Sequence, residues 1–96
     1  MNTADAIRLL AESKPMLAER FGVKDLALFG STARGSAGAA SDVDVLVAFD
    51  GPATSARYFG VQFYLEDLMG CAVDLVTDKA LRPELRPFVE REAIHV

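Results

Sequence analysis

The chain has 96 residues, 51% of them hydrophobic and 25% charged, with 10 basic and 14 acidic side chains and a net charge of −4. This length suits one domain with one core, and the acidic balance argues against a surface that binds duplex nucleic acid through its phosphates. Cys71 is the only cysteine, so an internal disulfide is excluded. The charges within residues 1–20 exclude a signal-peptide core, and no apolar run reaches the ~18–20 residues of a membrane span. We therefore expect a cytoplasmic protein.

Apolar side chains recur with helical or strand spacing along the chain. Thr3 can cap a first helix. Pro15 disfavours its continuation and suits the first turn of a second helix, with Lys14 as its cap and Gly22 as its left-handed end. The expected elements, in order, are helices over 4–12 and 15–21, a strand over 23–29, a helical turn over 31–34, a strand over 42–49, a helix over 55–69, a strand over 72–77, helical turns to 90 and a short strand over 93–96.

This order of elements predicts an α/β (α+β) fold with a small mixed β-sheet. Two strands follow each other through a loop, and the third is reached through a helix, which is the pattern of a mixed sheet rather than of a helical bundle. We expect the helices to cover one face of the sheet and to leave the other face open. We expect residues 1–96 to form a single domain.

Two carboxylates, Asp42 and Asp44, open the second expected strand. Side chains at i and i+2 of a strand share a face, about 7 Å apart at the backbone. That separation lets them converge on two metal ions held about 3.5–4 Å apart, as in phosphoryl-transfer sites. The alternative is a solvent-facing pair. Since Asp is depleted in strands and like charges on one face repel, the pair needs a compensating cation, either Lys/Arg or a metal.

A third carboxylate, Asp74, interrupts the apolar run 72–76. One interpretation places it on the exposed side of an edge strand. The other places it on the strand beside Asp42 and Asp44, facing them. Three carboxylates on one sheet face favour a hard cation with oxygen ligands, Mg²⁺ or Mn²⁺. Their mutual repulsion should raise their pKa values in the metal-free protein.

The turn Gly30-Ser31 directly follows the first expected strand. Gly30 permits close approach of a phosphate, and the Ser31 hydroxyl and N–H can donate to the β,γ-phosphates of a nucleotide. A tight strand-to-helix turn is the structural alternative. Arg34 is either a further phosphate contact or the partner of a nearby carboxylate, with equal support for each. His95 lacks His or Cys partners for a ligand set.

Three parts of the sequence together resemble the minimal nucleotidyltransferase (MNT) family of the DNA polymerase β-like superfamily. They are Gly30-Ser31-x-Ala33-Arg34-Gly35, then Ser41-Asp42-Val43-Asp44, and then Asp74 in a later strand. The resemblance covers nearly the whole chain. It implies an antitoxin that transfers AMP from ATP to a tyrosine of a HEPN ribonuclease toxin and thereby silences it. It also implies that Asp42 and Asp44 bind two Mg²⁺ ions (or Mn²⁺), that Asp74 binds the second ion and helps to deprotonate the attacking hydroxyl, and that Gly30 and Ser31 hold the triphosphate, with Arg34 as a further cofactor-binding candidate.

The expected partners are therefore ATP and a HEPN toxin, joined in a hetero-oligomer, with neither membrane nor direct nucleic-acid binding. Two alternatives stay open. One is a non-catalytic antitoxin that acts by binding alone, and the other is a nucleotidyltransferase with a small-molecule or RNA acceptor. The three intact carboxylates favour the enzyme, because a pure binder has no need of mutually repelling charges. The short chain leaves little room to enclose a second small substrate, which favours a macromolecular acceptor.

Overall fold

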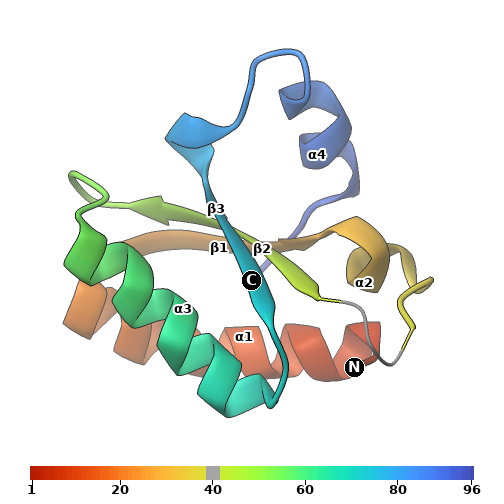
Figure 1. The fold of residues 1–96 in the computed structure, drawn as a ribbon, viewed down its shortest axis with the longest axis horizontal. Coiled ribbons are helices and arrows are strands. Elements are labelled where there is room, and N and C mark those ends of the chain that lie inside the picture. The colour runs from red at the N-terminus through yellow and green to blue at the C-terminus, as the bar shows by residue number, and fades with distance from the viewer. Residues whose placement is uncertain (39–41) are drawn as a thin grey trace.

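The strands form one mixed sheet in the order β3-β2-β1-β4 (Figure 1). The computed structural model describes residues 1–38 and 42–96. β2 runs antiparallel to β1 and parallel to β3, and β4 adds an antiparallel pair at the outer edge of β1. The strands are β1 (Val23–Phe29), β2 (Val43–Phe49), β3 (Val73–Thr77) and β4 (Ile94–His95). The small mixed sheet predicted from the sequence is confirmed.

Two long helices, α1 and α3, cover one face of this sheet (Figure 1). A short helix, α2, follows β1 directly, and a 3-10 helix, η1, and the helix α4 lie between β3 and β4. The bounds are α1 Thr3–Phe21, α2 Gly30–Arg34, α3 Ser55–Met69, η1 Asp78–Ala80 and α4 Arg86–Glu92. Within the described parts of the chain, no helix combines the length and apolar composition that crossing a bilayer requires.

The first helix is longer than the sequence pattern predicts. α1 runs through Pro15 without a break, so the prediction of two helices with Lys14 as a cap is wrong. A proline cannot donate to the carbonyl four residues earlier, here that of Ala11. Both Pro15 and Ala11 are exposed, so water can bond this carbonyl oxygen and the helix continues. The helix ends, as predicted, at Gly22 in the left-handed conformation, with φ of 71°.

The N-cap of α1 also differs from the prediction. Asn2, rather than Thr3, caps the helix, because its side-chain oxygen accepts the backbone N–H of Asp5 at 2.8 Å. Thr3 is instead the first helical residue, and its hydroxyl donates to the carbonyl oxygen of Thr32 in α2. The N-terminus of α1 is thereby tied to the short helix that follows β1.

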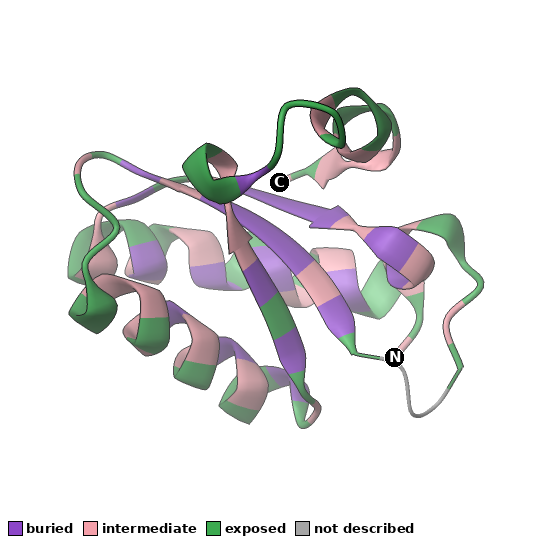
Figure 2. Ribbon diagram, turned by 45° about the horizontal axis from the view of Figure 1, so that its top comes forward, coloured by how far each residue is buried: buried purple, intermediate pink, exposed green. Residues whose placement is uncertain are grey.

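Along β2, side chains that point into the core alternate with side chains that point to the opposite face of the sheet, where Asp44 lies. Val43, Val45 and Val47 are buried in the main core between the sheet and the helices α1 and α3. Figure 2 shows this pattern as alternating burial along the strands. Because successive side chains of a strand point to opposite faces, Asp44 lies on the face away from this core, as predicted.

The second face of the sheet carries a smaller apolar cluster. Ala27, Leu46 and Leu81 are buried there, with Val89 and Ala93 of the C-terminal segment packed against them. α4 therefore lies on the opposite side of the sheet from α1 and α3 (Figure 1). The expectation that this face is left open holds only in part, since the C-terminal segment covers a portion of it.

Candidate active site

Asp44 on β2 lies directly beside Asp74 on β3, because the parallel register pairs these two positions. Asp44 is half-buried and Asp74 is exposed. Burial and then the charge of Asp74 raise the pKa of Asp44 above its ordinary value of 3.8, and the carboxyl–carboxyl hydrogen bond with Asp74 and the charge of Asp42 add to this rise. The repulsion that the sequence predicts among these residues is therefore present at Asp44.

Asp42 stands apart from this pair. It is exposed and precedes the first residue of β2. Over residues 1–38 and 42–96, no three acidic, histidine or cysteine side chains converge closely enough to hold one metal ion. The structure thus brings together two of the three predicted ligands, Asp44 and Asp74, and leaves Asp42 at the entrance to the strand.

The chemistry of these donors fits a hard divalent cation. Oxygen ligands select Mg²⁺ or Mn²⁺ over softer metals, and a cation between Asp44 and Asp74 would relieve the repulsion that raises the Asp44 pKa. Asp44 and Asp74 would hold such an ion.

Gly30 lies against Asp44 of the acidic pair. It begins α2 directly after β1, whose last residue, Phe29, pairs with Asp44 on β2. A Cβ atom added to Gly30 would overlap Oδ2 of Asp44, and the φ of 72° at Gly30 already disfavours any other residue type. A glycine is therefore needed here both by the turn and by the carboxylate beside it.

Ser31 follows at the start of α2. Its carbonyl oxygen accepts the N–H of Ser36 at 3.0 Å. Its hydroxyl group bonds to no other group in the described part of the chain, and the residue is half-buried. The hydroxyl can therefore donate to an anion that approaches the turn. Ser41, which belongs to the same sequence motif, lies outside the described residues.

Arg34 has a carboxylate partner. Its Nη1 atom lies 2.8 Å from Oε2 of Glu92 in α4, and the other oxygen of Glu92 accepts the backbone N–H of Gly30 at 3.1 Å. The hydrogen bond from Arg34, joined by the Gly30 N–H, lowers the pKa of Glu92 below its ordinary value. Of the two interpretations of Arg34, the structure shows the ion pair, and phosphate binding stays a prediction.

Sequence reasoning did not find Glu92. It is 58 residues from Arg34 and 62 from Gly30, and no local pattern marks it. The one sequence signal for Glu92 is its place between the apolar residues of α4 and the short strand β4, which pairs with β1.

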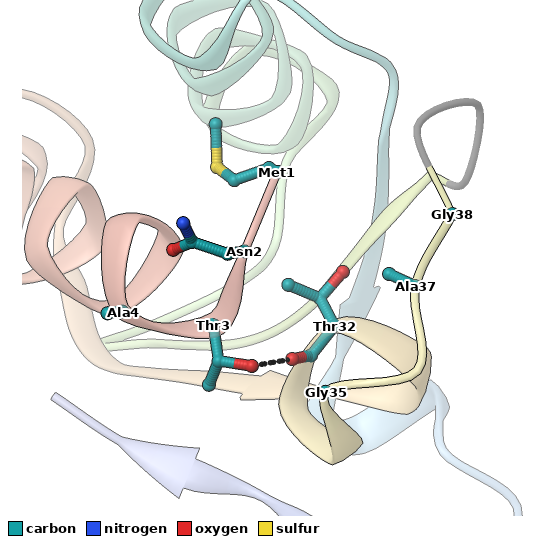
Figure 3. A pocket seen from close by; sticks show the side chains of 8 residues that line it. All are labelled: Met1, Asn2, Thr3, Ala4, Thr32, Gly35, Ala37 and Gly38. Atoms are coloured by element: carbon teal, nitrogen blue, oxygen red, sulfur yellow. Dashed lines mark hydrogen bonds between the residues drawn. The ribbon is translucent and has the colours of Figure 1, made fainter.

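A separate cavity of about 510 Å³ lies between the N-terminus of α1 and the segment after α2 (Figure 3). The hydrogen bond from Thr3 to the carbonyl oxygen of Thr32 crosses it. Its lining residues are Met1, Asn2, Thr3, Ala4, Thr32, Gly35, Ala37 and Gly38. None of the predicted site residues belongs to this lining, so the cavity is distinct from the acidic pair and the Gly30-Ser31 turn.

A mixed sheet that carries paired aspartates beside a glycine–serine turn is the arrangement of a nucleotidyltransferase, and residues 10–96 match the family described as nucleotidyltransferase domain. The chain is 40% identical over 88 residues to the protein adenylyltransferase MntA of Thermococcus cleftensis, covering 92% of this chain and 89% of that one. It is 37% identical over 98 residues to a Methanocaldococcus jannaschii protein named as a candidate protein adenylyltransferase, covering 100% of both chains.

Solved structures agree with this assignment. A structure described as a candidate minimal nucleotidyltransferase matches with a TM-score of 0.82 and 39% identity, over 98% of this chain and 95% of that one. The chain therefore belongs to the minimal nucleotidyltransferase family, as the motif predicts.

Two complexes share the fold at lower identity. One is the tri-AMPylated Shewanella oneidensis HEPN toxin with its MNT antitoxin (TM-score 0.61, 20% identity, 98% of this chain and 67% of that one). The other is a toxin–antitoxin complex with AMP-PNP (TM-score 0.70, 22% identity, 99% of this chain and 72% of that one). At these identities the likeness concerns the fold alone.

Proposed function

We propose that this chain is an antitoxin that transfers AMP from ATP to a tyrosine of a HEPN ribonuclease toxin and thereby neutralises it. The observation that carries this proposal is the direct pairing of Asp44 with Asp74 next to the Gly30 turn. The relatives named as protein adenylyltransferases and the AMPylated toxin held by an MNT antitoxin support the same reaction and the same class of partner.

In this proposal the aspartates bind the metal ions, and the Gly30-Ser31 turn binds the phosphates. Asp42, Asp44 and Asp74 would hold two Mg²⁺ or Mn²⁺ ions, which when bound lower the pKa of the attacking hydroxyl and neutralise charge on the phosphates. Gly30 and Ser31 would receive the triphosphate through backbone N–H groups and the Ser31 hydroxyl.

The transfer of AMP is a displacement at the α-phosphorus of ATP. The tyrosine oxygen forms a bond to that phosphorus while the bond to the pyrophosphate leaving group breaks. The proton of the tyrosine hydroxyl passes to Asp74, which is exposed and can be reached by a group from a second molecule. Asp44 is half-buried, so Asp74 is the better placed of the pair to reach a hydroxyl on a second molecule.

The exposure of the site favours a macromolecular acceptor. Asp42 and Asp74 are both exposed, and neither lines the cavity between the N-terminus of α1 and the segment after α2. A partner that supplies the tyrosine would also exclude water from the reacting atoms. We therefore propose a hetero-oligomer with the toxin, acting in the cytoplasm.

The experiment combines the purified chain, Mg²⁺, ATP labelled on the α-phosphate and a candidate HEPN toxin. We expect label on a tyrosine of the HEPN protein and none with Asp44→Asn. Stable binding without label would favour the non-catalytic antitoxin. Label that appears only on RNA or on a small molecule would favour the alternative acceptors.

A further inference from the structure

Glu92, the last residue of α4, contacts both ends of α2. One of its carboxylate oxygens accepts the N–H of Gly30 at 3.1 Å, and the other pairs with Arg34 at 2.8 Å. Gly30 is the first residue of α2 and Arg34 is the last. A single carboxylate from the C-terminal helix therefore fixes the turn after β1 at two points.

The position of Glu92 is itself held from both sides. On one side, Val89 and Ala93 pack on the buried cluster of Ala27 and Leu46. On the other side, β4 follows immediately and pairs with β1. The Glu92 carboxylate is thus held beside α2 by α4 and β4, both of which pack on or pair with the sheet.

Arg34 has a second acidic neighbour. Burial and the charge of Asp74 raise the pKa of Asp44, and the charge of Arg34 opposes this rise, so the guanidinium lies within electrostatic range of Asp44. Glu92 takes only one of the several N–H donors of Arg34, which leaves the others for another acceptor. Without Glu92, Arg34 would be able to pair with Asp44. That contact would take a carboxylate from the cation and a guanidinium from the phosphates.

We propose that Glu92 is a positioning residue for nucleotide binding. It holds the Gly30-Ser31 turn, in which Gly30 is left-handed, and keeps Arg34 beside that turn, with donors available for the phosphates. This role rests on the proposed function, in which the turn and Arg34 receive the triphosphate. Glu92 acts through Gly30 and Arg34 and has no contact with the nucleotide itself.

Two substitutions separate the contacts of Glu92. Glu92→Gln keeps an oxygen that can accept the Gly30 N–H but removes the charge that pairs with Arg34. Glu92→Ala removes both contacts. Glu90→Gln is the matched control, because Glu90 lies on the same helix and pairs instead with Arg86 at 3.2 Å.

The measurement is the Kd of a non-hydrolysable ATP analogue with Mg²⁺, alongside the Tm of each variant. Glu92→Gln should raise the Kd roughly fivefold, the size of a partly exposed ion pair. Glu92→Ala should raise it more than roughly tenfold, since the Gly30 N–H then loses its acceptor. Glu90→Gln should bind like wild type. A purely structural Glu92 would lower the Tm and leave the Kd of the folded protein unchanged.

A double variant tests whether Glu92 acts through Arg34. In an Arg34→Ala background, Glu92→Gln should weaken binding no further, because the contact it removes is already absent. Equal binding by wild type and Glu92→Gln, or an undiminished effect of Glu92→Gln in that background, would overturn the role of Glu92 while the nucleotide function stands. If wild type itself fails to bind the analogue with Mg²⁺, the proposed function fails, and the role of Glu92 with it.

Discussion

Asp44 and Asp74 occupy directly paired positions on the parallel strands β2 and β3. Like charges at paired positions of a sheet destabilise it. Burial first, and then the charge of Asp74, raise the pKa of Asp44, so part of this rise reflects that cost. A fold selected for stability alone gains nothing from such a pair. Its presence beside the Gly30 turn favours a site that a cation and a phosphate complete.

Replacing Asp44 by asparagine should stabilise the metal-free protein at neutral pH. Because the pKa of Asp44 is raised in the folded state, the folded protein binds more protons than the unfolded chain between 3.8 and the raised value. Stability therefore falls as pH rises through this window, and the penalty is complete above it. Thermal unfolding without metal should show a Tm gain for Asp44→Asn on the order of a few degrees per kcal/mol relieved.

That gain should disappear below pH 3.8, where Asp44 is protonated in both states. Asp67→Asn is a suitable control, since Asp67 is exposed on α3. A Tm for Asp44→Asn equal to that of wild type at neutral pH would contradict the raised pKa of Asp44 that burial and the charge of Asp74 cause.

Alanine at Gly30 should disable the site, whereas alanine at Gly70 should only strain the backbone. The two glycines have φ of 72° and 69°, so each substitution carries a left-handed strain of about 1–2 kcal/mol. A Cβ at Gly70 meets nothing within 4 Å, but one at Gly30 overlaps the Asp44 carboxylate. Gly30→Ala should lose the rise in Tm caused by Mg²⁺ with ATP, and Gly70→Ala should keep it. A normal response in Gly30→Ala would show that the turn does not shape the site.

Removing the Ser31 hydroxyl should weaken the reaction without unfolding the protein. If this hydroxyl donates one hydrogen bond to a charged phosphate, Ser31→Ala should lower kcat/KM for ATP by roughly 10- to 150-fold. Ser36→Ala is the control, because Ser36 is exposed after α2 and, among residues 1–38 and 42–96, bonds only to the Ser31 carbonyl oxygen. Steady-state kinetics with both variants decides the point, and equal kcat/KM for Ser31→Ala and wild type would remove Ser31 from the site.

The sequence predicts those parts of the fold that depend on local pattern. Alternation of valines with Asp44 correctly places β2 and its two faces, and the left-handed glycine at Gly22 correctly ends α1. Pro15 misleads, because α1 continues through it. Ala11, whose carbonyl oxygen loses its helical donor, is exposed, so water can bond that oxygen.

The candidate site is less predictable than the strands that carry it. Local pattern does not determine that Asp74 pairs with Asp44 rather than with another residue of β2, since register depends on the whole sheet. The motif resemblance supplies that placement. The contact of Glu92 with Gly30 and Arg34 joins distant segments and becomes visible only when α4 is seen on the sheet.

The dependence of neutralisation on AMP transfer is tested most directly by the Asp42→Ala/Asp44→Ala double variant in cells that express the partner toxin. The variant should still bind the toxin, because Asp42 and Asp44 belong to the proposed metal site rather than to the apolar contacts expected at an interface. Mass spectrometry of the toxin should show no added AMP, and the cells should lose protection. Protection equal to that given by the wild-type chain would contradict the enzymatic account and show that neutralisation occurs by binding alone.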